Sequence, residues 1–559
     1  MEESKNRRIG TRTDRDGVRV GQSFASPTQD TRRSEIQVPP NEVVPILFVP
    51  GIMGSNLRNR QSEESVWNAS TLLSLAWQWA FRSAKTRQAK LDPSTTEADP
   101  EGKIPKVADY AGDDGKPQDL DEDQLRERGW GTVSNYGYGD FMAWFEATLN
   151  KGDANPWMDL AGKDDDPVRT APGEWGAQKE FSPLSLLEAS GAWEKQCPIY
   201  GAGYNWLQSN GKSAVDLAKR IDGIIAEWRD KEVGGKKVYR CEKVLLVTHS
   251  MGGLVSRGAV HADYGNATDR ILGICHGVMP ADGAAASYHH VRSGYNGFSR
   301  FVLGKDAAQV TAIFAQSCGP LELLPSNLYG PRWLKVVEGT GSSAREVLTL
   351  PNDDPYVEIY AKRDKWYRLI DPELIDPGKK STSAKATGGE AVDPWVGYVE
   401  KLLVAKKFHK RTGQTFHSPT YAHYGADAAR ESYQNIVWGT NQRVMLGETE
   451  LLESGSVNAR GWSALKLAFT LGKDNSDPVR LVQGDGQLVF EIAGPAEPGD
   501  DTVPENSGAG PFIRGARNVR QSLRLQKMSK GHAGSYDDDN VRDITRYSVA
   551  KILSEKVGP

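Results

Sequence analysis

Ser250 stands in a sequence context that could make its hydroxyl a nucleophile. The segment 242–260, EKVLLVTHSMGGLVSRGAV, begins with apolar residues typical of a buried strand and continues with small residues suited to a tightly packed helix. Thr248 and Gly252 stand two residues on either side of the serine, which is nearly the G-x-S-x-G pattern. A strand that turns directly into a helix lifts its corner side chain above the sheet, where the helix N-terminus favours developing negative charge. The segment therefore predicts attack by Ser250 on an acyl group, at an elbow slightly displaced by the bulk of Thr248.

A serine hydroxyl needs a histidine to remove its proton, and that histidine needs an acid to fix its tautomer. In the fold that carries this pattern, the chain order is serine, acid, histidine. His532 is the only histidine after residue 423, and it lies in a short Gly-flanked loop. We therefore predict that His532 is the base. The side chain of His249 is expected to project away from the neighbouring Ser250 and to serve in packing or hydrogen bonding.

Three aspartates could supply the acid. Asp500 and Asp501 are adjacent in GDDTVP, and Asp485 lies in QGDGQLV, a similar turn beside a predicted strand. Each could instead be a turn former whose carboxylate bonds to nearby backbone. Residue types and spacing alone leave the choice among the three open.

A second loop, PGIMGS at 50–55, directly follows an apolar run at 43–49. In hydrolases with the serine pattern above, a loop in this position supplies an oxyanion-hole amide. The string PILFVPGIMGSNL resembles the opening of the lecithin:cholesterol acyltransferase-like lipases, and GDDTVP resembles their G-D-x-T-V segment. The resemblance implies that Asp500 is the acid. It also implies oxyanion-hole amides from Ile52, after the first loop glycine, and from Met251, after the nucleophile.

The elements that must position these residues follow from hydrophobic patterning. Buried strands are predicted at 43–49, 244–247 and 271–278, with a further strand and its loop at 197–204. Apolar residues at helical spacing predict a helix over 213–230. Strands alternating with helices indicate right-handed crossovers and a parallel sheet. The expected fold class is α/β, an α/β-hydrolase core with a mainly parallel sheet and large inserted cap or lid regions.

A chain of 559 residues exceeds a single compact core. We expect a flexible N-terminal arm over 1–40 and the first part of the core over 41–283, with an insertion at about 60–190. A cap or lid insertion is expected over 284–460, and the second part of the core over 461–559. Further core strands are predicted at 464–471 and 488–493, with a terminal helix over 541–553. Aromatic helices at 67–80 and 141–149 could form a lid, an acyl-binding cap or a core of their own.

The composition limits the possible partners and cofactors. Lys and Arg number 69 against 73 Asp and Glu, so the net charge of −4 gives no basic excess for nucleic acid. The N-terminal sequence has no apolar signal segment, and no apolar run is long enough to span a membrane. The four cysteines form no C-x-x-C pair, and we expect neither a metal ion nor a cofactor. An acidic run at 113–123 is expected to be a solvated loop, with calcium binding as the alternative.

The predicted chemistry is that of a serine lipase or phospholipase that cleaves acyl esters of membrane lipids. The segment RGWG…YGDFMAWFEATL at 128–149 resembles bacterial lipase effectors delivered by type VI secretion. That resemblance implies a membrane phospholipid substrate, a cognate immunity protein and a secretion-apparatus carrier. It also implies a cytoplasmic product that leaves the producer without a signal peptide and acts in the periplasm or at the membrane of a target cell. Two alternatives stay open: an acyltransferase or glycolipid deacylase with the same triad, and an inactive hydrolase fold that serves as a binding module.

Overall fold

A computed structural model of the chain describes residues 7–9, 11–13, 19–21, 34–36, 41–68, 71–106, 121–150, 155–161, 183–233, 235–295, 299–339, 344–379, 393–453, 479–483, 486–515 and 517–555. Most of the predicted arm, the predicted strand at 464–471, the candidate acid Asp485 and residues 113–120 of the acidic run lie outside these ranges. Among the helices of the described ranges, none combines the length and the apolar character needed to cross a bilayer.

Six parallel strands form the central sheet, in the order β22–β16–β13–β12–β5–β9. Their bounds are Ile46–Val49 (β5), Ile199–Gly201 (β9), Val244–His249 (β12), Ile271–Gly277 (β13), Thr420–Gly425 (β16) and Val519–Leu525 (β22). The central strand β12 is buried along its whole length, as its continuous apolar run predicted. The predicted α/β-hydrolase core with a parallel sheet is confirmed.

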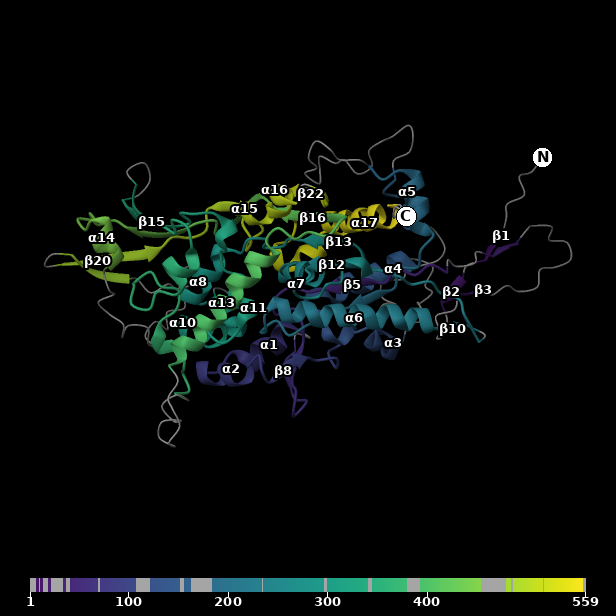
Figure 1. The fold of residues 1–559 in the computed structure, drawn as a ribbon, viewed down its shortest axis with the longest axis horizontal. Helices are drawn as coiled ribbons and strands as arrows, with labels where there is room; N and C mark the ends of the chain where they lie inside the picture. Colours follow the sequence, from purple (N-terminus) through teal and green to yellow (C-terminus); the bar gives the residue numbers. More distant parts are fainter. Residues whose placement is uncertain are drawn as a thin grey trace.

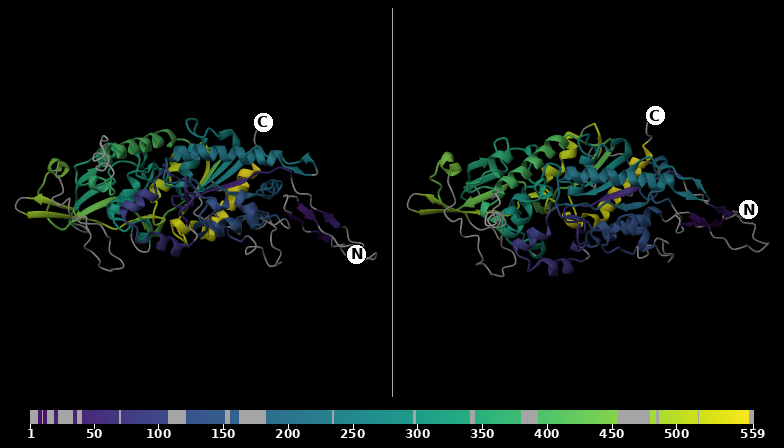
Figure 2. Two further views of the ribbon diagram at one scale, coloured as in Figure 1. Left: turned by 90° about the horizontal axis from the view of Figure 1, so that it is seen from below. Right: turned by 60° about the horizontal axis from the view of Figure 1, so that its bottom comes forward.

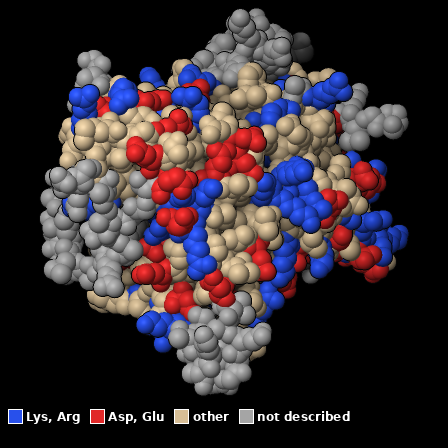
Figure 3. Space-filling model, turned by 60° about the vertical axis from the view of Figure 1, so that its left-hand side comes forward, with Lys and Arg blue, Asp and Glu red and all other residues tan. Residues whose placement is uncertain are grey.

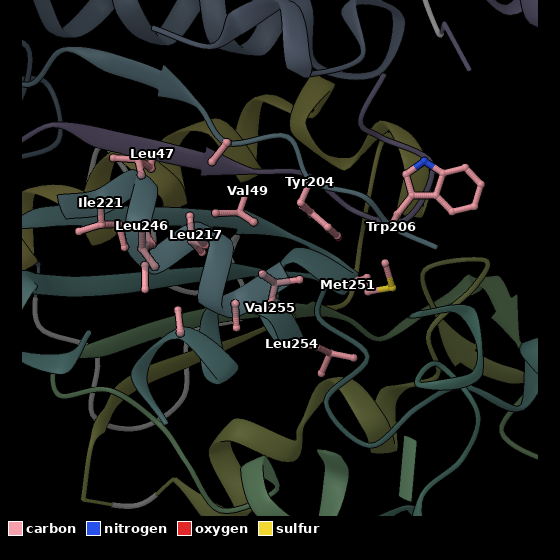
Figure 4. Packing of buried hydrophobic residues seen from close by; sticks show 14 of the residues in the cluster. Leu47, Val49, Tyr204, Trp206, Leu217, Ile221, Leu246, Met251, Leu254 and Val255 are labelled. Atoms are coloured by element: carbon pink, nitrogen blue, oxygen red, sulfur yellow. The ribbon is translucent and has the colours of Figure 1, made fainter. Parts of the chain in front are cut away.

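Helices cover both faces of this sheet (Figures 1 and 2). Helices α6 (Asn210–Asp230) and α7 (Met251–Val260) share one apolar cluster with the sheet, and α4 (Asp140–Asn150), α5 (Leu186–Trp193) and α17 (Asp539–Ser554) share the other. Because successive strand side chains point to opposite faces, Leu246 packs with α6 and α7, and Val247 packs with the second set. Figure 4 shows Leu246 beside Leu217 and Ile221 of α6, with Val255 of α7 nearby. This packing anchors the strand and the helix that meet at Ser250.

A second sheet lies at the end of the molecule opposite α5 (Figure 1). Its strand order is β15–β14–β18–β20–β19, with bounds Leu334–Glu338 (β14), Arg345–Leu350 (β15), Ile436–Thr440 (β18), Val479–Gln483 (β19) and Gly486–Ile492 (β20). Helices α8 (Ala285–Ser293), α10 (Ala307–Phe314) and α13 (Pro394–Thr412) share its apolar cluster. These elements together are called the five-stranded lobe below.

The sheet pairings differ from the predicted boundaries between core and cap. Strand β16 belongs to the central sheet although it lies within the range 284–460 expected to form the cap. Strand β20 covers most of the predicted core strand at 488–493 but pairs within the five-stranded lobe. Helices α4 and α5, from the predicted insertion at 60–190, build one layer of the core. A buried apolar run has the same pattern in either sheet, so the sequence could not assign it. The division into domains stays a prediction.

Shorter elements connect these layers. The ones that bear on the site are β6 (Leu57–Asn59), β7 (Ser65–Trp67), β8 (Thr96–Ala98), α1 (Leu72–Trp79), α2 (Ala84–Lys90), α3 (Glu122–Glu127), η3 (Asn135–Gly139), β17 (Asp427–Ser432), β21 (Glu497–Gly499), α15 (Glu505–Gly508), α16 (Gly510–Arg514) and η9 (His532–Asp537). In the acidic run, Asp121 caps α3 by accepting from the Gln124 backbone N–H.

Candidate active site

Ser250 occupies the corner between β12 and α7. Its backbone has φ 52° and ψ −125°, a strained conformation for a residue with a side chain, costing about 1–3 kcal/mol. Two features hold the serine in this conformation. Its N–H donates to the Gly277 carbonyl at 2.9 Å. Gly252 packs so closely against β5 that an added Cβ would lie 2.2 Å from the Val49 carbonyl oxygen. Thr248 is accommodated because its Oγ1 pairs with His276 Nδ1 at 3.0 Å inside the core. The elbow geometry expected from the sequence is therefore present.

The structure brings three of the predicted residues into one hydrogen-bonded line. His532 Nε2 lies 2.8 Å from Ser250 Oγ, and His532 Nδ1 lies 2.8 Å from Asp500 Oδ2. An ionised carboxylate only accepts hydrogen bonds, so Nδ1 carries the proton and Nε2 presents a lone pair to the serine hydroxyl. This is the tautomer that a general base requires.

Asp500 is fully buried, and its second oxygen is also occupied. Oδ1 accepts the backbone N–H groups of Thr502 at 3.1 Å and Val503 at 2.7 Å, which compensates for burying the carboxylate. The His532 N–H donates to the Asp500 carbonyl at 2.7 Å, so the two loops are also joined through the backbone. Asp501 is half-exposed and its carboxylate turns to Arg430 at 2.9 Å. Of the two adjacent aspartates, Asp500 therefore contacts the histidine, whereas Asp485 lies outside the described residues.

Arg430 of β17 joins the acid loop to the loop that leads into His532. Its Nε donates to the Met528 carbonyl and its Nη2 to the Ser529 carbonyl, both at 2.9 Å, while Nη1 pairs with Asp501. The planar guanidinium suits this three-way contact because its donors have fixed directions. Sequence reasoning missed Arg430, since its partners are backbone carbonyls almost 100 residues away and no local motif marks it.

The predicted oxyanion residues Ile52 and Met251 both lie near the nucleophile. Met251 follows Ser250 at the start of α7. A Cβ built on Gly51 would lie 2.9 Å from Ser250 Cβ, so the loop that carries Ile52 abuts the serine. Within the described part of the chain, no acceptor takes up the backbone N–H of Ile52 or of Met251. Both amides therefore lack an acceptor within the described chain, as the predicted oxyanion role requires.

Comparison with known proteins places the chain in a family. No family model and no curated protein sequence matches it. Among solved structures, it is similar to the crystal structure of the Tle4–Tli4 complex, with 30% sequence identity and a TM-score of 0.70 over 92% of this chain and 99% of that chain. The chain belongs to the Tle4 family. The predicted resemblance to bacterial type VI secretion lipase effectors is thereby confirmed.

A phospholipase PlaB structure from Legionella pneumophila aligns far more weakly, at 12% identity and a TM-score of 0.14 over 49% of this chain and 60% of that chain. A similarity this weak does not indicate a shared fold. Membership of the Tle4 family rests on the first comparison alone.

Two further side chains of the Tle4-family chain hold the loop that carries Ile52. Tyr204 Oη donates to the Pro50 carbonyl at 3.0 Å, and Trp67 Nε1 donates to the Met53 carbonyl at 3.0 Å. Met53 has φ 62°, so this loop stores backbone strain as the elbow does. Tyr204 lies in the Y-G-x-G-Y-x-W pattern of the sequence, whereas Trp67 ends β7 and does not begin the helix expected at 67–80. Within the described ranges, no group of three or more His, Cys, Asp or Glu residues is arranged to hold a metal ion.

Proposed function

We propose that this chain is a serine lipase that hydrolyses acyl esters of membrane phospholipids. The observation that carries the proposal is the line from Ser250 Oγ through His532 to the buried Asp500, with 2.8 Å at each step. A buried acid, a histidine in the tautomer of a general base and a strained serine elbow together suit acyl transfer from an ester.

The reaction would run in two halves. His532 Nε2 takes the Ser250 proton as Oγ attacks the ester carbonyl, and the amides of Ile52 and Met251 donate to the oxygen that becomes negative. Collapse breaks the ester bond, and His532 gives the proton to the departing lysolipid alcohol. Water then attacks the acyl-enzyme with His532 again as base, which releases the fatty acid and restores the serine. Asp500 holds the imidazole tautomer throughout, and no cofactor takes part in these steps.

The proposal extends to delivery and partners. Family membership supports a type VI effector that acts in the periplasm or at the membrane of a target cell and travels on a secretion-apparatus carrier. The related structure is a Tle4–Tli4 complex, which supports a cognate immunity protein as a partner of this chain as well.

The decisive experiment measures lysophospholipid and free fatty acid released from vesicles of defined phospholipids. Ser250→Ala is expected to reduce release by about 10⁴-fold or more, because the nucleophile is gone. Ser256→Ala is the matched control: it lies in α7, the helix that begins after Ser250, it is buried as Ser250 is, and its hydroxyl has no hydrogen-bond partner among the described residues. It should keep wild-type activity.

Added acceptor alcohol separates hydrolysis from transfer, because an acyltransferase would form a new ester in its presence. Labelling by a fluorophosphonate probe tests the binding-module alternative, since only an activated serine reacts. A wild-type chain that releases no fatty acid and takes up no probe would overturn the proposal. Production directed to the periplasm of a bacterial host should be toxic in a Ser250-dependent way, and cytoplasmic production should be harmless.

A further inference from the structure

A chain of three hydrogen bonds, two of them buried and the third partly buried, links two loops of the site. The Gly51 backbone N–H lies 3.2 Å from Tyr138 Oη, and Tyr138 Oη lies 2.8 Å from His249 Nδ1. His249 Nε2 lies 2.8 Å from the backbone oxygen of His532. One end of the chain therefore adjoins Ile52, the predicted oxyanion residue, and the other end is the residue that carries the base.

The two ends fix the direction of every bond in the chain. A carbonyl oxygen only accepts, so His249 Nε2 carries the proton and donates to His532. Burial, with a smaller contribution from neighbouring His532, lowers the pKa of His249 to about 3, so the ring is neutral and Nδ1 accepts. Tyr138 Oη must then donate to Nδ1 and accept the Gly51 N–H. Burial raises the pKa of Tyr138, which keeps that proton in place.

Close packing shows that this arrangement is built into the backbone. A Cβ added to Gly51 would lie 2.8 Å from His249 Nδ1, and one added to Gly54 would lie 2.6 Å from Tyr138 Cε2. Both loop glycines therefore stand against the tyrosine–histidine pair at distances that no side chain would permit. Tyr138 itself lies in η3, a turn of π-helix just before α4. Such turns are rare in proteins, and those that occur often lie at functional sites.

We propose that Tyr138 and His249 form a positioning relay that holds the oxyanion loop and the base loop in register around Ser250. The inference rests on the proposed hydrolase function and assigns a role to the YGYGD segment that the reaction itself leaves unexplained. Neither side chain hydrogen-bonds to the Ser250 hydroxyl or to a ring nitrogen of His532, so both act through the Gly51 N–H and the His532 carbonyl. Breaking the relay should lower kcat more than it changes KM, because a displacement of about 1 Å in a reacting group costs about 100-fold in rate while lipid contacts stay intact.

Tyr138→Phe is the main test, because it removes one hydroxyl and keeps the ring packed against Phe48, 4.9 Å away between centroids. It leaves the Gly51 N–H and His249 Nδ1 buried without partners. We expect kcat on a soluble ester and on phospholipid vesicles to fall about 10–100-fold, with KM changed less than about threefold. Tyr398→Phe is the matched control, since it also removes one buried tyrosine hydroxyl, which here donates to the Tyr360 carbonyl at 2.9 Å in the five-stranded lobe. It should lower the melting temperature similarly without loss of kcat.

A second variant keeps the test sharp if Tyr138→Phe folds poorly. His249→Gln offers one acceptor and one donor in place of the two ring nitrogens, so it should retain more kcat than His249→Leu, which offers neither. The double variant Tyr138→Phe, His249→Gln should lose less activity than the product of the single losses, because both residues belong to one chain of bonds.

The outcomes separate the relay from the function on which it rests. Wild-type hydrolysis that depends on Ser250, together with full kcat in Tyr138→Phe, would refute the relay and leave the hydrolase intact. Equal kcat losses in Tyr138→Phe and Tyr398→Phe would also refute it, since they would indicate a general effect of lost stability. A wild-type chain without activity or probe labelling would refute both proposals.

Discussion

At the scale of single residues, environment decides which of two neighbouring aspartates serves the site. Asp500 and Asp501 are chemically identical and adjacent, yet one is fully buried against His532 and the other is half-exposed against Arg430. The φ of 78° at Asp501 turns the backbone so that the two carboxylates face opposite partners. The result is one carboxylate that orients an imidazole and one that ties two loops together.

Asp500→Asn and Asp501→Asn form a matched pair that tests this assignment. Asp500→Asn should lower kcat by about 10⁴-fold, because an amide in that place favours the wrong histidine tautomer. Asp501→Asn keeps the shape of the side chain and an acceptor oxygen but removes the charge. It should retain activity within about tenfold, since only the charge-assisted bond to Arg430 is weakened. Steady-state kinetics on a soluble ester measure both. Comparable losses in the two variants would contradict the distinction between the carboxylates.

At the scale of elements, the site depends on how closely α7 approaches the end of β5. Strand β12 pairs with β5 and with β13, with Thr248 opposite Val49 and His249 opposite Gly277. The carboxyl ends of the three strands are therefore level, and the loops that follow them meet at Ser250. The helix can begin at that level only because Gly252 lacks a side chain on the side of β5.

Gly252→Ala and Gly253→Ala test this approach with the same added methyl group. At Gly252 the new Cβ would meet the Val49 and Pro50 carbonyls at 2.2 and 2.5 Å, and backbone cannot yield without moving the elbow. At Gly253 its nearest neighbours belong to the Met279 side chain, the closest being Sδ at 2.5 Å, and a flexible thioether can move aside. We expect Gly252→Ala to lose more than about 100-fold in kcat/KM and Gly253→Ala to lose less than about tenfold. Kinetics together with melting temperature provide the measurement, and the reverse order would exclude the backbone contact as the cause.

At the scale of the whole molecule, charged side chains are spread over the face shown in Figure 3, while several histidines are held in the interior. Basic and acidic side chains are interspersed over the face in Figure 3, consistent with a net charge of only −4. Inside, burial lowers the pKa of His249 and His276 to about 3, and that of His409 and His423 to about 4. These four imidazoles stay neutral in the folded chain at any pH near neutrality.

Stability should therefore fall steeply on mild acidification. Below about pH 6.5 the unfolded chain protonates these four histidines and the folded chain leaves them neutral, so the unfolded state binds more protons. The contribution of the neutral histidines to the free energy of unfolding is complete above that pH. It is lost progressively toward pH 4, at about 1.4 kcal/mol per histidine per pH unit. Urea unfolding at pH 7.5, 6.5 and 5.5 measures the effect. In His423→Asn the free energy of unfolding should change less with pH, by the equivalent of about one bound proton. A free energy of unfolding that stays constant over this range would contradict the prediction.

The sequence alone determined the local elements and most of the local chemistry. The apolar run before Ser250 and the small residues after it predicted β12 and α7, because burial on both faces and close helix packing each leave a pattern within a few residues. Chain order singled out His532, and resemblance singled out Asp500. The convergence of these two side chains with Ser250 agrees with those predictions, while the catalytic roles stay proposals.

Only the tertiary structure decided which distant segments meet. Strand β16, TYAHYG, joined the core and β20, GQLVFEI, joined the five-stranded lobe, because strand partners are chosen by long-range pairing that leaves no local trace. Arg430 and Tyr138 gained their roles in the same way, through partners about 70–110 residues away along the chain. A short pattern specifies how a segment folds on itself, whereas hydrogen bonds between loops depend on the whole chain having closed around them.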